Sequence, residues 1–453
     1  MKKYLAPALF TCLFFAIAGY AQPVQVTNKP ERVNWYQDLG FGMFIHWNAD
    51  VVLGAVISHS LAGASDEYVD KYFRELPGYF NPEKFAPKEW AKAARLAGMK
   101  YMVFTTKHHS GFCMWNTQST SLNIMNSAFK RDITKELVEA FRKEGIAIGF
   151  YFSPEDFHYF HENKIPIGRL QLPQQYPVNN PGLMAHDKKQ LKELLTQYGK
   201  IDILFIDGPG DGLREYAWSL QPELVITRDL MKTPEQNTPD EPLPRPWEAC
   251  YTMGTDWGYK PTNDPHKSGT QVINMLIEIR SKGGNFLLNV GPKPDGELAP
   301  EDQSLLQEIA LWNFANAEAV YKVKPLPVIR EGDIWYTQSN DEKFIYAYVI
   351  RSSPADWKYG ERKQLVLTHI EGNSNTRVTV LGYKSELVEY KNNFDAAVYL
   401  APTSIGLVIS AVNGQRFYTN NQWPNAVVLK IENARFRKAV TPAASQSSID
   451  GAK

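Results

Sequence analysis

Apolar runs alternate with amphipathic segments along residues 41–321. The runs are continuous rather than alternating, which is typical of strands buried on both faces of a parallel sheet. We expect strands at 41–47, 100–106, 146–153, 201–207, 223–227, 247–253 and 285–291. We expect helices between or after them at 87–98, 134–145, 185–199, 268–284 and 300–321. The early helices end in Gly just before the next strand, as helix C-caps do.

This alternation predicts parallel strands, in either an open doubly wound sheet or a (β/α)8 barrel. No Gly-x-Gly-x-x-Gly motif follows the first strand, which disfavours a dinucleotide-binding open sheet. Roughly eight strand–helix units over about 290 residues suit the size of a barrel. We therefore predict an α/β fold with a (β/α)8-like (TIM) barrel.

The pattern changes after about residue 326, where short runs alternate with period 2 and predict an antiparallel β-sandwich. These runs lie at 333–338, 343–350, 363–370, 376–382, 387–391, 406–411 and 426–432. The small, polar residues that end the chain indicate a disordered tail. We expect a signal peptide at 1–21, the catalytic barrel at 22–325, a C-terminal β-sandwich at 326–440 and the tail at 441–453.

The N-terminus, "MKKYLAPALFTCLFFAIAGYAQ", is typical of a secretory signal peptide. Lys2 and Lys3 precede an apolar run, and small residues stand before a cleavage site after Ala21. A lipoprotein signal ending at Cys12 is the alternative, but the bulky Phe10 fits it poorly. No later apolar stretch is long enough to predict a membrane span. We expect an exported protein, either periplasmic or extracellular.

Charge and cysteine content exclude some classes of protein. Lys plus Arg equals Asp plus Glu at 49 each, and no long run of one sign occurs. This balance argues against a nucleic-acid binder, which would carry a basic patch. Beyond the signal peptide only Cys113 and Cys250 remain, too few for a disulfide framework, so we expect two partly buried thiols.

Titratable and aromatic side chains occur at or near the ends of several predicted strands. In a barrel, the carboxyl ends of the strands form the active-site face. Taken singly, each of these side chains could be structural; a histidine, for example, could lie in the core with both ring nitrogens hydrogen-bonded. Since adjacent strand residues point to opposite faces, only one of the two neighbouring histidines need face the barrel axis. The residues are His46, His108, His109, Tyr151, Asp207 and Glu248.

The segment "IDILFIDGPG" places an Asp at each end of one apolar strand. Asp202 and Asp207 are separated by on the order of 16 Å of extended chain, which puts Asp202 at the bottom rim and Asp207 at the top. Ending such a strand with a carboxylate is costly without a function. Two carboxylates, Asp207 and Glu248, flanked by histidines and aromatic rings indicate a glycosidase site.

These stretches resemble the α-L-fucosidases of glycoside hydrolase family 29. The matching segments run in the family's order, and include "GMFIHWN", "TTKHHSGFCMWNT", "DILFIDG", "WEACYTMGTDWGY" and "GGNFLLNVGPKPDG". The resemblance implies a (β/α)8-like barrel with a C-terminal β-sandwich. It also implies a retaining exo-α-L-fucosidase that acts on a fucosylated oligosaccharide or glycoconjugate and needs no cofactor or metal.

The resemblance assigns roles by position. Asp207 falls on the family's nucleophile and Glu248 on its acid/base. Arg228 is the nearest candidate for the arginine that the family often supplies to the sugar. The remaining substrate-binding positions are His46, His108, His109, Tyr151 and Trp257.

Some features depart from the family or leave its subgroup open. Asn48 stands where the family usually has Gly, and Ser110 where it usually has Asp, so we expect a reshaped pocket rim. The segment "KTPEQ" favours the subgroup that acts on branched α-1,3/1,4-linked fucose. Two alternatives remain: a weakly active or inactive glycan-binding protein on the same scaffold, and a metal-dependent barrel hydrolase using the histidines between 46 and 161.

Overall fold

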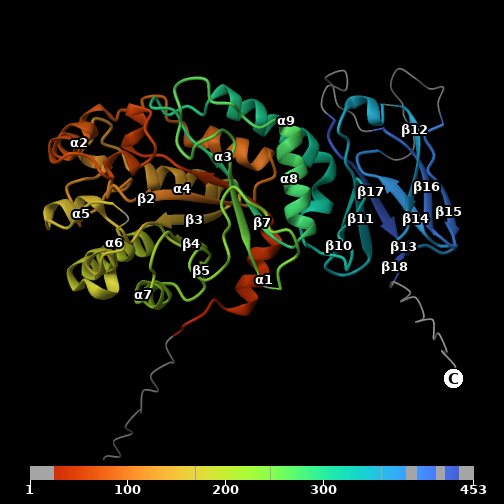
Figure 1. Cartoon of the computed structure of the whole chain (residues 1–453), viewed down its shortest axis with the longest axis horizontal. Helices are drawn as coiled ribbons and strands as arrows, with labels where there is room; N and C mark the ends of the chain where they lie inside the picture. Colours follow the sequence, from red (N-terminus) through yellow and green to blue (C-terminus); the bar gives the residue numbers. More distant parts are fainter. Residues whose placement is uncertain are drawn as a thin grey trace, which may run out of the picture.

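The computed structural model describes residues 25–437 except 169, 245, 359, 384–394 and 415–423. The predicted signal peptide at 1–21, the predicted tail at 441–453 and the period-2 run at 387–391 lie outside the described residues. A parallel sheet forms one part of the molecule and antiparallel sheets form the other (Figure 1).

The parallel sheet has seven strands in the order β5-β4-β3-β2-β1-β7-β6. Almost every residue of these strands is buried, which explains their continuous apolar sequences. The strands are β1 (Phe41–Ile45), β2 (Tyr101–Lys107), β3 (Ala147–Phe152), β4 (Ile203–Ile206), β5 (Val225–Ile226), β6 (Glu248–Thr252) and β7 (Asn285–Val290). This sheet confirms the predicted fold class, a TIM-like α/β fold with parallel strands.

The sheet is a half-barrel of seven strands within the described residues, rather than the eight units expected. Between β5 and β6 the chain runs parallel to β6 through isolated bridges only, Lys232 with Trp247 and Glu235 with Cys250. Pro234 has no N–H to donate to a neighbouring strand, which prevents a regular strand here. This irregular segment still carries residues up to the rim of the barrel.

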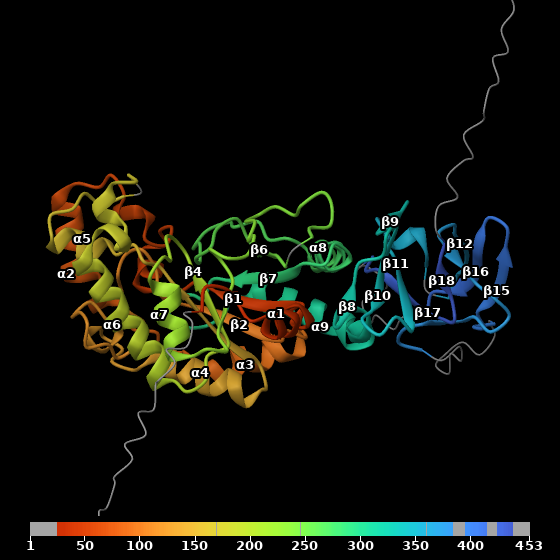
Figure 2. The same cartoon turned by 90° about the horizontal axis from the view of Figure 1, so that it is seen from below.

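Helices lie around the outside of the parallel sheet (Figures 1 and 2). Their starts follow sequence rules: Asp132 caps α4, and Ser268 with Gln271 forms a capping box on α8. The helices are α1 (Pro30–Leu39), α2 (Asp66–Tyr79), α3 (Pro87–Leu96), α4 (Ile133–Lys143), α5 (Phe157–Glu162), α6 (Pro181–Gln197), α7 (Leu213–Leu220), α8 (Gly269–Ser281) and α9 (Pro300–Val320). Of these, α1, α2, α5 and α7 were not among the predicted helices.

The antiparallel part follows α9. One sheet has the order β14-β17-β11-β10-β8, with β9 beside β10, and a second has the order β12-β16-β15. The strands are β8 (Val323–Lys324), β9 (Arg330–Glu331), β10 (Ile334–Ser339), β11 (Phe344–Val349), β12 (Arg362–Leu367), β13 (Ile370–Glu371), β14 (Arg377–Val380), β15 (Tyr399–Thr403), β16 (Gly406–Val412), β17 (Val427–Glu432) and β18 (Arg435–Phe436). Their buried residues form a separate apolar core, as the period-2 pattern predicts.

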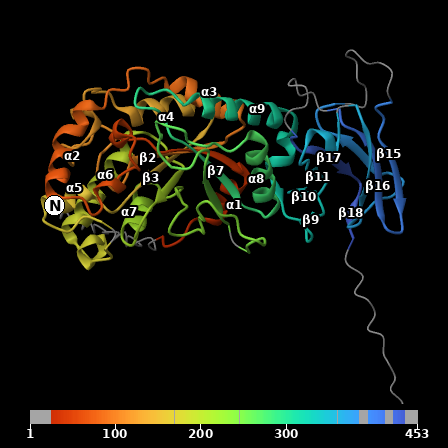
Figure 3. The ribbon, with the colours of Figure 1, turned by 45° about the horizontal axis from the view of Figure 1, so that its top comes forward.

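The two parts meet along α8 and α9, which lie between the parallel sheet and the antiparallel sheets (Figures 1 and 3). The indole of Trp312 on α9 donates a hydrogen bond to the carbonyl of Ala426, 2.8 Å away. Cys113 and Cys250 are free thiols, as expected, and both are fully rather than partly buried. Within the described ranges, none of the helices combines the length and apolar character that a membrane crossing requires.

Candidate active site

A cavity of about 280 Å³ opens at the carboxyl end of the parallel sheet. It receives side chains from the ends of β1 to β4 and from the loops that follow β1, β5 and β6. This is the face on which barrel enzymes carry their active sites. The cavity is lined by Phe44, His46, Val56, Ile57, His59, His108, Tyr151, Phe205, Asp207, Arg228, Glu235 and Trp257.

Asp207 stands directly after β4 and is surrounded by hydrogen-bond donors. The hydroxyl of Tyr151 donates to Oδ2 at 2.6 Å, and Nε of Arg228 lies 3.0 Å from Oδ1. Nε2 of His109 lies 3.5 Å from Oδ2. The side chain is 14% exposed, so one edge remains open to the cavity. These contacts fix the carboxylate and favour its charged form.

His46 is held as a neutral hydrogen-bond acceptor. The amide of Asn289 donates through Nδ2 to the carbonyl of Trp257, so its Oδ1 faces Nδ1 of His46 at 2.6 Å. Nδ1 must therefore carry a proton. Burial lowers the pKa of His46 to about 4, so at neutral pH its Nε2 is an unprotonated acceptor. The indole of Trp257 packs against this ring, with ring centroids 4.9 Å apart.

Each of the neighbouring histidines is braced by a serine. Nδ1 of His108 lies 2.8 Å from Oγ of Ser58, and its ring stacks on Tyr151 with centroids 5.2 Å apart. Nδ1 of His109 lies 2.5 Å from Oγ of Ser153. Alternation along a strand had predicted that only one histidine need face the site. His108 lines the cavity and His109 contacts Asp207, because β2 ends at Lys107 and the two histidines begin a turn instead of continuing the strand.

Lys107 itself points away from the cavity into a buried ionic cluster. Its Nζ lies 3.3 Å from Oδ2 of Asp156 and 3.0 Å from Oδ1 of Asp187, with all three side chains almost fully buried. Asp156 also caps α5 by accepting from the N–H of Tyr159. The cluster therefore anchors the loop after β3 to the end of β2.

Arg228 and Glu235 form the wall of the cavity beside Asp207. The guanidinium of Arg228 contacts Asp207 through Nε and Glu235 through Nη1. Arg228 therefore lines the cavity, and its contact with the sugar stays a prediction. Glu235 and His59 were missed as site residues. Glu235 lies in the "KTPEQ" segment, and His59 in the loop after β1, where barrel loops carry functional side chains.

Glu248 does not stand opposite Asp207, which corrects the expectation drawn from the resemblance. It is the first residue of β6, at the amino end of the sheet beside Asn285, and it is not among the described residues that line the cavity. Its Oε2 accepts hydrogen bonds from the hydroxyls of Tyr36 and Tyr101. Burial raises its pKa to about 7. The strand that separates the two ends keeps this carboxyl away from the site.

The two departures from the family pattern contact each other. Nδ2 of Asn48 donates to Oγ of Ser110 at 3.4 Å, and both side chains are buried. The N–H of Ser110 donates to Oγ of Ser58, the serine that braces His108. Both side chains therefore lie buried behind His108 rather than at an exposed rim, and a reshaped pocket stays a prediction.

His108, His109 and Asp207 each offer one potential ligand atom within 4.8 Å of the others, which is a spacing that suits a metal ion. The guanidinium of Arg228 already contacts this carboxylate and brings a fixed positive charge. A divalent cation would be opposed by that charge. The residues present therefore suit an uncharged, hydroxyl-rich ligand better than a metal.

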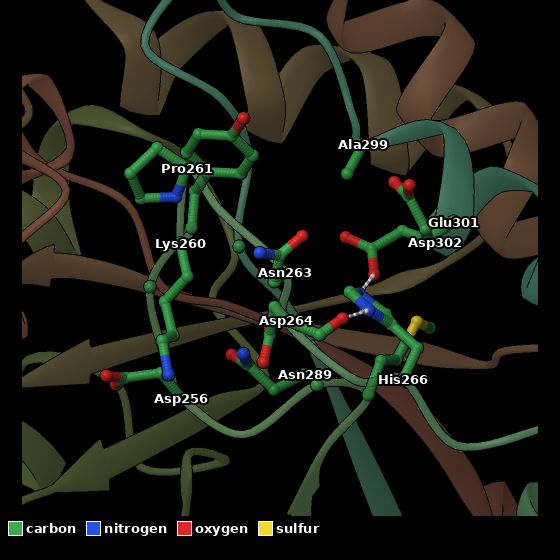
Figure 4. Close-up of a pocket in the computed structure, with 15 residues that line it drawn as sticks. Asp256, Lys260, Pro261, Asn263, Asp264, His266, Asn289, Ala299, Glu301 and Asp302 are labelled. Carbon is green, nitrogen blue, oxygen red and sulfur yellow. Dashed lines mark hydrogen bonds and ion pairs between the residues drawn. The ribbon is translucent and has the colours of Figure 1, made fainter.

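A second cavity of about 230 Å³ is formed by the segments that follow β6 and β7, with Asp256, Asp264 and Asp302 among the residues that line it (Figure 4). Asp256 and Gly258, the chain neighbours of Trp257, line it together with Asn289. His266 bonds to Asp302 there, and this hydrogen bond raises the pKa of His266 to about 9. The segment around Trp257, together with Asn289, thus connects this cavity with the one that holds Asp207.

Comparison with known proteins shows the family to which the chain is similar. The α-L-fucosidase family model matches residues 10–318. The chain is 28% identical to the tissue α-L-fucosidase of Homo sapiens over 443 residues, which cover 84% of this chain and 90% of that protein. It is 27% identical to the plasma α-L-fucosidase of Homo sapiens over 408 residues, covering 78% and 82%.

Solved structures agree. The α-L-fucosidase isoenzyme 1 from Paenibacillus thiaminolyticus superposes with a TM-score of 0.71 at 27% identity, covering 89% of this chain and 98% of that one. A glycoside hydrolase family 29 α-L-fucosidase from Bacteroides thetaiotaomicron gives 0.69 at 25% identity, covering 93% and 99%. The similarity therefore extends over both the parallel and the antiparallel parts.

Proposed function

This chain belongs to the α-L-fucosidase family of glycoside hydrolases, and we propose that it releases terminal α-linked L-fucose by a retaining, double-displacement mechanism. The observation that carries the proposal is the cavity at the end of β4. There one guanidinium, that of Arg228, contacts two carboxylates, those of Asp207 and Glu235. Retaining glycosidases need two carboxyl groups separated by about 5–5.5 Å.

The lining suits a fucose ring. His46 supplies an acceptor for a sugar hydroxyl, and Trp257 supplies an aromatic face for the apolar side of the ring. Val56 and Ile57 provide an apolar wall for the methyl group that replaces the C6 hydroxyl of other hexoses. His108 and His109 retain their predicted sugar-binding role in this proposal.

In the proposed first step, an Asp207 oxygen attacks the anomeric carbon while the glycosidic bond breaks. Glu235 gives its proton to the departing oxygen. In the second step, Glu235 takes a proton from water, and the water oxygen attacks the anomeric carbon as the bond to Asp207 breaks. Glu235 replaces Glu248 as the acid/base because Glu235 lines the cavity and Glu248 does not.

Substrate turnover and azide rescue test these roles. We expect the wild type to release fucose from an aryl α-L-fucoside, with α-fucose as the first product seen by NMR. Glu235→Ala with azide should give α-fucosyl azide, because azide replaces water in the second step. Asp207→Ala with azide should give β-fucosyl azide, because azide then attacks in place of the carboxylate.

Glu248→Ala is the matched control and should form no azide adduct that wild type lacks. Inversion by the wild type would contradict retention. Fucose binding without release from any substrate would instead indicate a glycan-binding protein.

We further propose a preference for branched α-1,3/1,4-linked fucose. The "KTPEQ" segment supports it, since Glu235 in that segment lines the cavity, and the second cavity, lined in part by the chain neighbours of Trp257, offers room for a branched leaving group. A higher kcat/KM on a Lewis-type branched oligosaccharide than on an aryl fucoside is the expected result. The reverse ranking would contradict the preference.

Export to the periplasm or exterior remains a proposal that rests on the N-terminal sequence. Expression of the full chain in a bacterium, followed by N-terminal sequencing of the protein from the periplasmic and culture fractions, tests it. We expect a mature N-terminus at Gln22. An intact Met1 in the cytoplasmic fraction would contradict it.

A further inference from the structure

The His109 ring is buried, at 1% exposure, and both of its nitrogens contact protein groups. Nδ1 faces Oγ of Ser153 at 2.5 Å, and Nε2 faces Oδ2 of Asp207 at 3.5 Å. The protein rather than solvent therefore sets which nitrogens carry protons.

Ser153 fixes the proton on Nδ1. A serine hydroxyl has one proton to give. Oγ of Ser153 also lies 3.0 Å from the backbone carbonyl of Glu155, which can only accept, so a hydroxyl that donates there is left to accept from the histidine. This arrangement, together with the Glu155 carboxylate 3.3 Å from Nδ1, favours a proton on Nδ1, and the charge state of the ring then depends on Nε2.

Glu155 adds a negative charge on the Nδ1 side. Its Oε2 lies 3.3 Å from Nδ1 of His109, while Asp207 stands at Nε2. A neutral ring would turn an Nε2 lone pair toward the oxygen of Asp207. A ring between two carboxylates is stabilised as the imidazolium. The other titratable groups nearby are His59 and His108, whose ring centroids lie 6.1 and 4.5 Å away.

Arg228, on the far side of Asp207, is the permanent cation that faces this group, and its charge opposes a second one. Arg228 contacts Oδ1 of Asp207, whereas Nε2 of His109 faces Oδ2, so two carboxylates contact the ring directly and the carboxylate of Asp207 partly neutralises Arg228. The balance of nearby charge therefore favours a charged ring.

The loop that carries Glu155 is rigidly tied to this ring. The N–H of Phe157 donates to the carbonyl of His109 at 2.7 Å, and the two rings stack with centroids 5.8 Å apart. The next residue, Asp156, is anchored by buried Lys107. Glu155 is thus held at a fixed distance from the histidine rather than extended into solvent.

We propose that Glu155 is a positioning residue of the hydrolase, holding His109 as an imidazolium whose Nε2–H donates toward Asp207 and toward a sugar hydroxyl beside it. The proposal rests on Asp207 being the nucleophile. His46 then serves as the neutral hydrogen-bond acceptor and His109 as the charged hydrogen-bond donor. The pocket therefore offers one sugar hydroxyl an acceptor and another hydroxyl a donor. Glu155 itself touches neither the sugar nor the reacting bond.

Two measurements on the full chain test this role. The first is the ¹⁵N NMR shift of the His109 ring nitrogens, assigned by comparison with His109→Gln. We expect both nitrogens to be protonated in the wild type at pH 7. In Glu155→Gln we expect Nε2 of His109 to lose its proton at a lower pH than in the wild type. The second is the pH profile of kcat/KM, whose alkaline limb should move to lower pH by about one unit in Glu155→Gln.

Glu155→Asp keeps the negative charge and should return the alkaline limb of the kcat/KM profile most of the way to its wild-type pH. Glu162→Gln is the matched control, because Glu162 pairs with His158, whereas Glu155 pairs with His109, which contacts Asp207. It should leave both readouts unchanged. A neutral His109 in the wild type would overturn the proposal even if Glu155→Gln failed to fold. So would an unchanged alkaline limb in a folded Glu155→Gln.

The NMR readout needs no turnover. If fucosidase activity were absent but His109 were charged in a Glu155-dependent way, the proposed function would fail while the positioning by Glu155 would stand.

Discussion

Two acidic residues at opposite ends of the parallel sheet show how position decides chemistry. Asp207 follows β4 at the carboxyl end and meets Arg228, Tyr151 and His109. Glu248 begins β6 at the amino end, and its carboxyl is bonded by two tyrosine hydroxyls. The first is surrounded by groups that stabilise negative charge. The second is buried among apolar and phenolic groups, and burial raises its pKa to about 7.

Glu248 shows that a carboxylate in a segment that resembles the family need not lie in the active site. Parallel strands bring their carboxyl ends together, so a residue that follows a strand enters the site. A residue that begins a strand enters the opposite end. Glu248 therefore has a structural environment, while Glu235 on the irregular segment reaches the cavity.

The largest expected effect on activity comes from neutralising Asp207, with the same change at Glu248 as the comparison. Asp207→Asn should lower kcat/KM for an aryl α-L-fucoside by at least about 10³-fold, as expected for loss of a nucleophile. Glu248→Gln should leave kcat/KM close to wild type. Initial-rate kinetics on folded, purified variants check both. A loss in Glu248→Gln as large as in Asp207→Asn would break the comparison.

The next effect concerns stability and pH. In the folded state the pKa of Glu248 is about 7, against an ordinary value of 4.5. Below pH 4.5 the Glu248 carboxyl is protonated in both the folded and the unfolded chain, so the protein keeps its full stability with respect to this group. As pH rises from 4.5 to 7 only the unfolded chain releases the proton, so stability is lost until the folded carboxyl also ionises.

Glu248→Gln removes this dependence. The difference in unfolding free energy between Glu248→Gln and the wild type should therefore move by about 3 kcal/mol in favour of the variant between pH 4.5 and pH 8. Urea unfolding at several pH values measures it, and any constant offset from the substitution cancels. A difference that stays flat with pH would show that Glu248 is ionised in the folded protein.

Much of the fold followed from the sequence. The apolar runs at 41–47, 100–106, 146–153 and 285–291 became β1, β2, β3 and β7, because burial on both faces demands continuous apolar sequence. The expected strand at 223–227 shortened to β5, Val225–Ile226, and the eighth unit did not form among the described residues. Pairing with a distant strand decides such short segments, and no local pattern encodes it.

The site was only partly predictable. Asp207 could be placed because it follows a strand, and the same rule would have placed Glu248 at the other end of the barrel. Glu235 could not be found by pattern, since it lies in a loop-like segment whose partner, β6, is reached only through isolated bridges. The bracing of His109 by Ser153 likewise depends on a contact between separate loops.

The smallest expected effect uses the two asparagines of β7, which repeat the comparison within one strand. Asn289 at the carboxyl end orients His46, whereas Asn285 at the amino end bonds to the carbonyl of Tyr36 and to Arg280. Asn289→Ala should lower kcat/KM by about tenfold, because His46 loses the bond that fixes its tautomer. Asn285→Ala should lower the Tm and leave kcat/KM near wild type. If the two variants lost activity equally, the amino and carboxyl ends of the sheet would not differ in function as proposed, and the contrast between Asp207 and Glu248 would reflect those two residues alone.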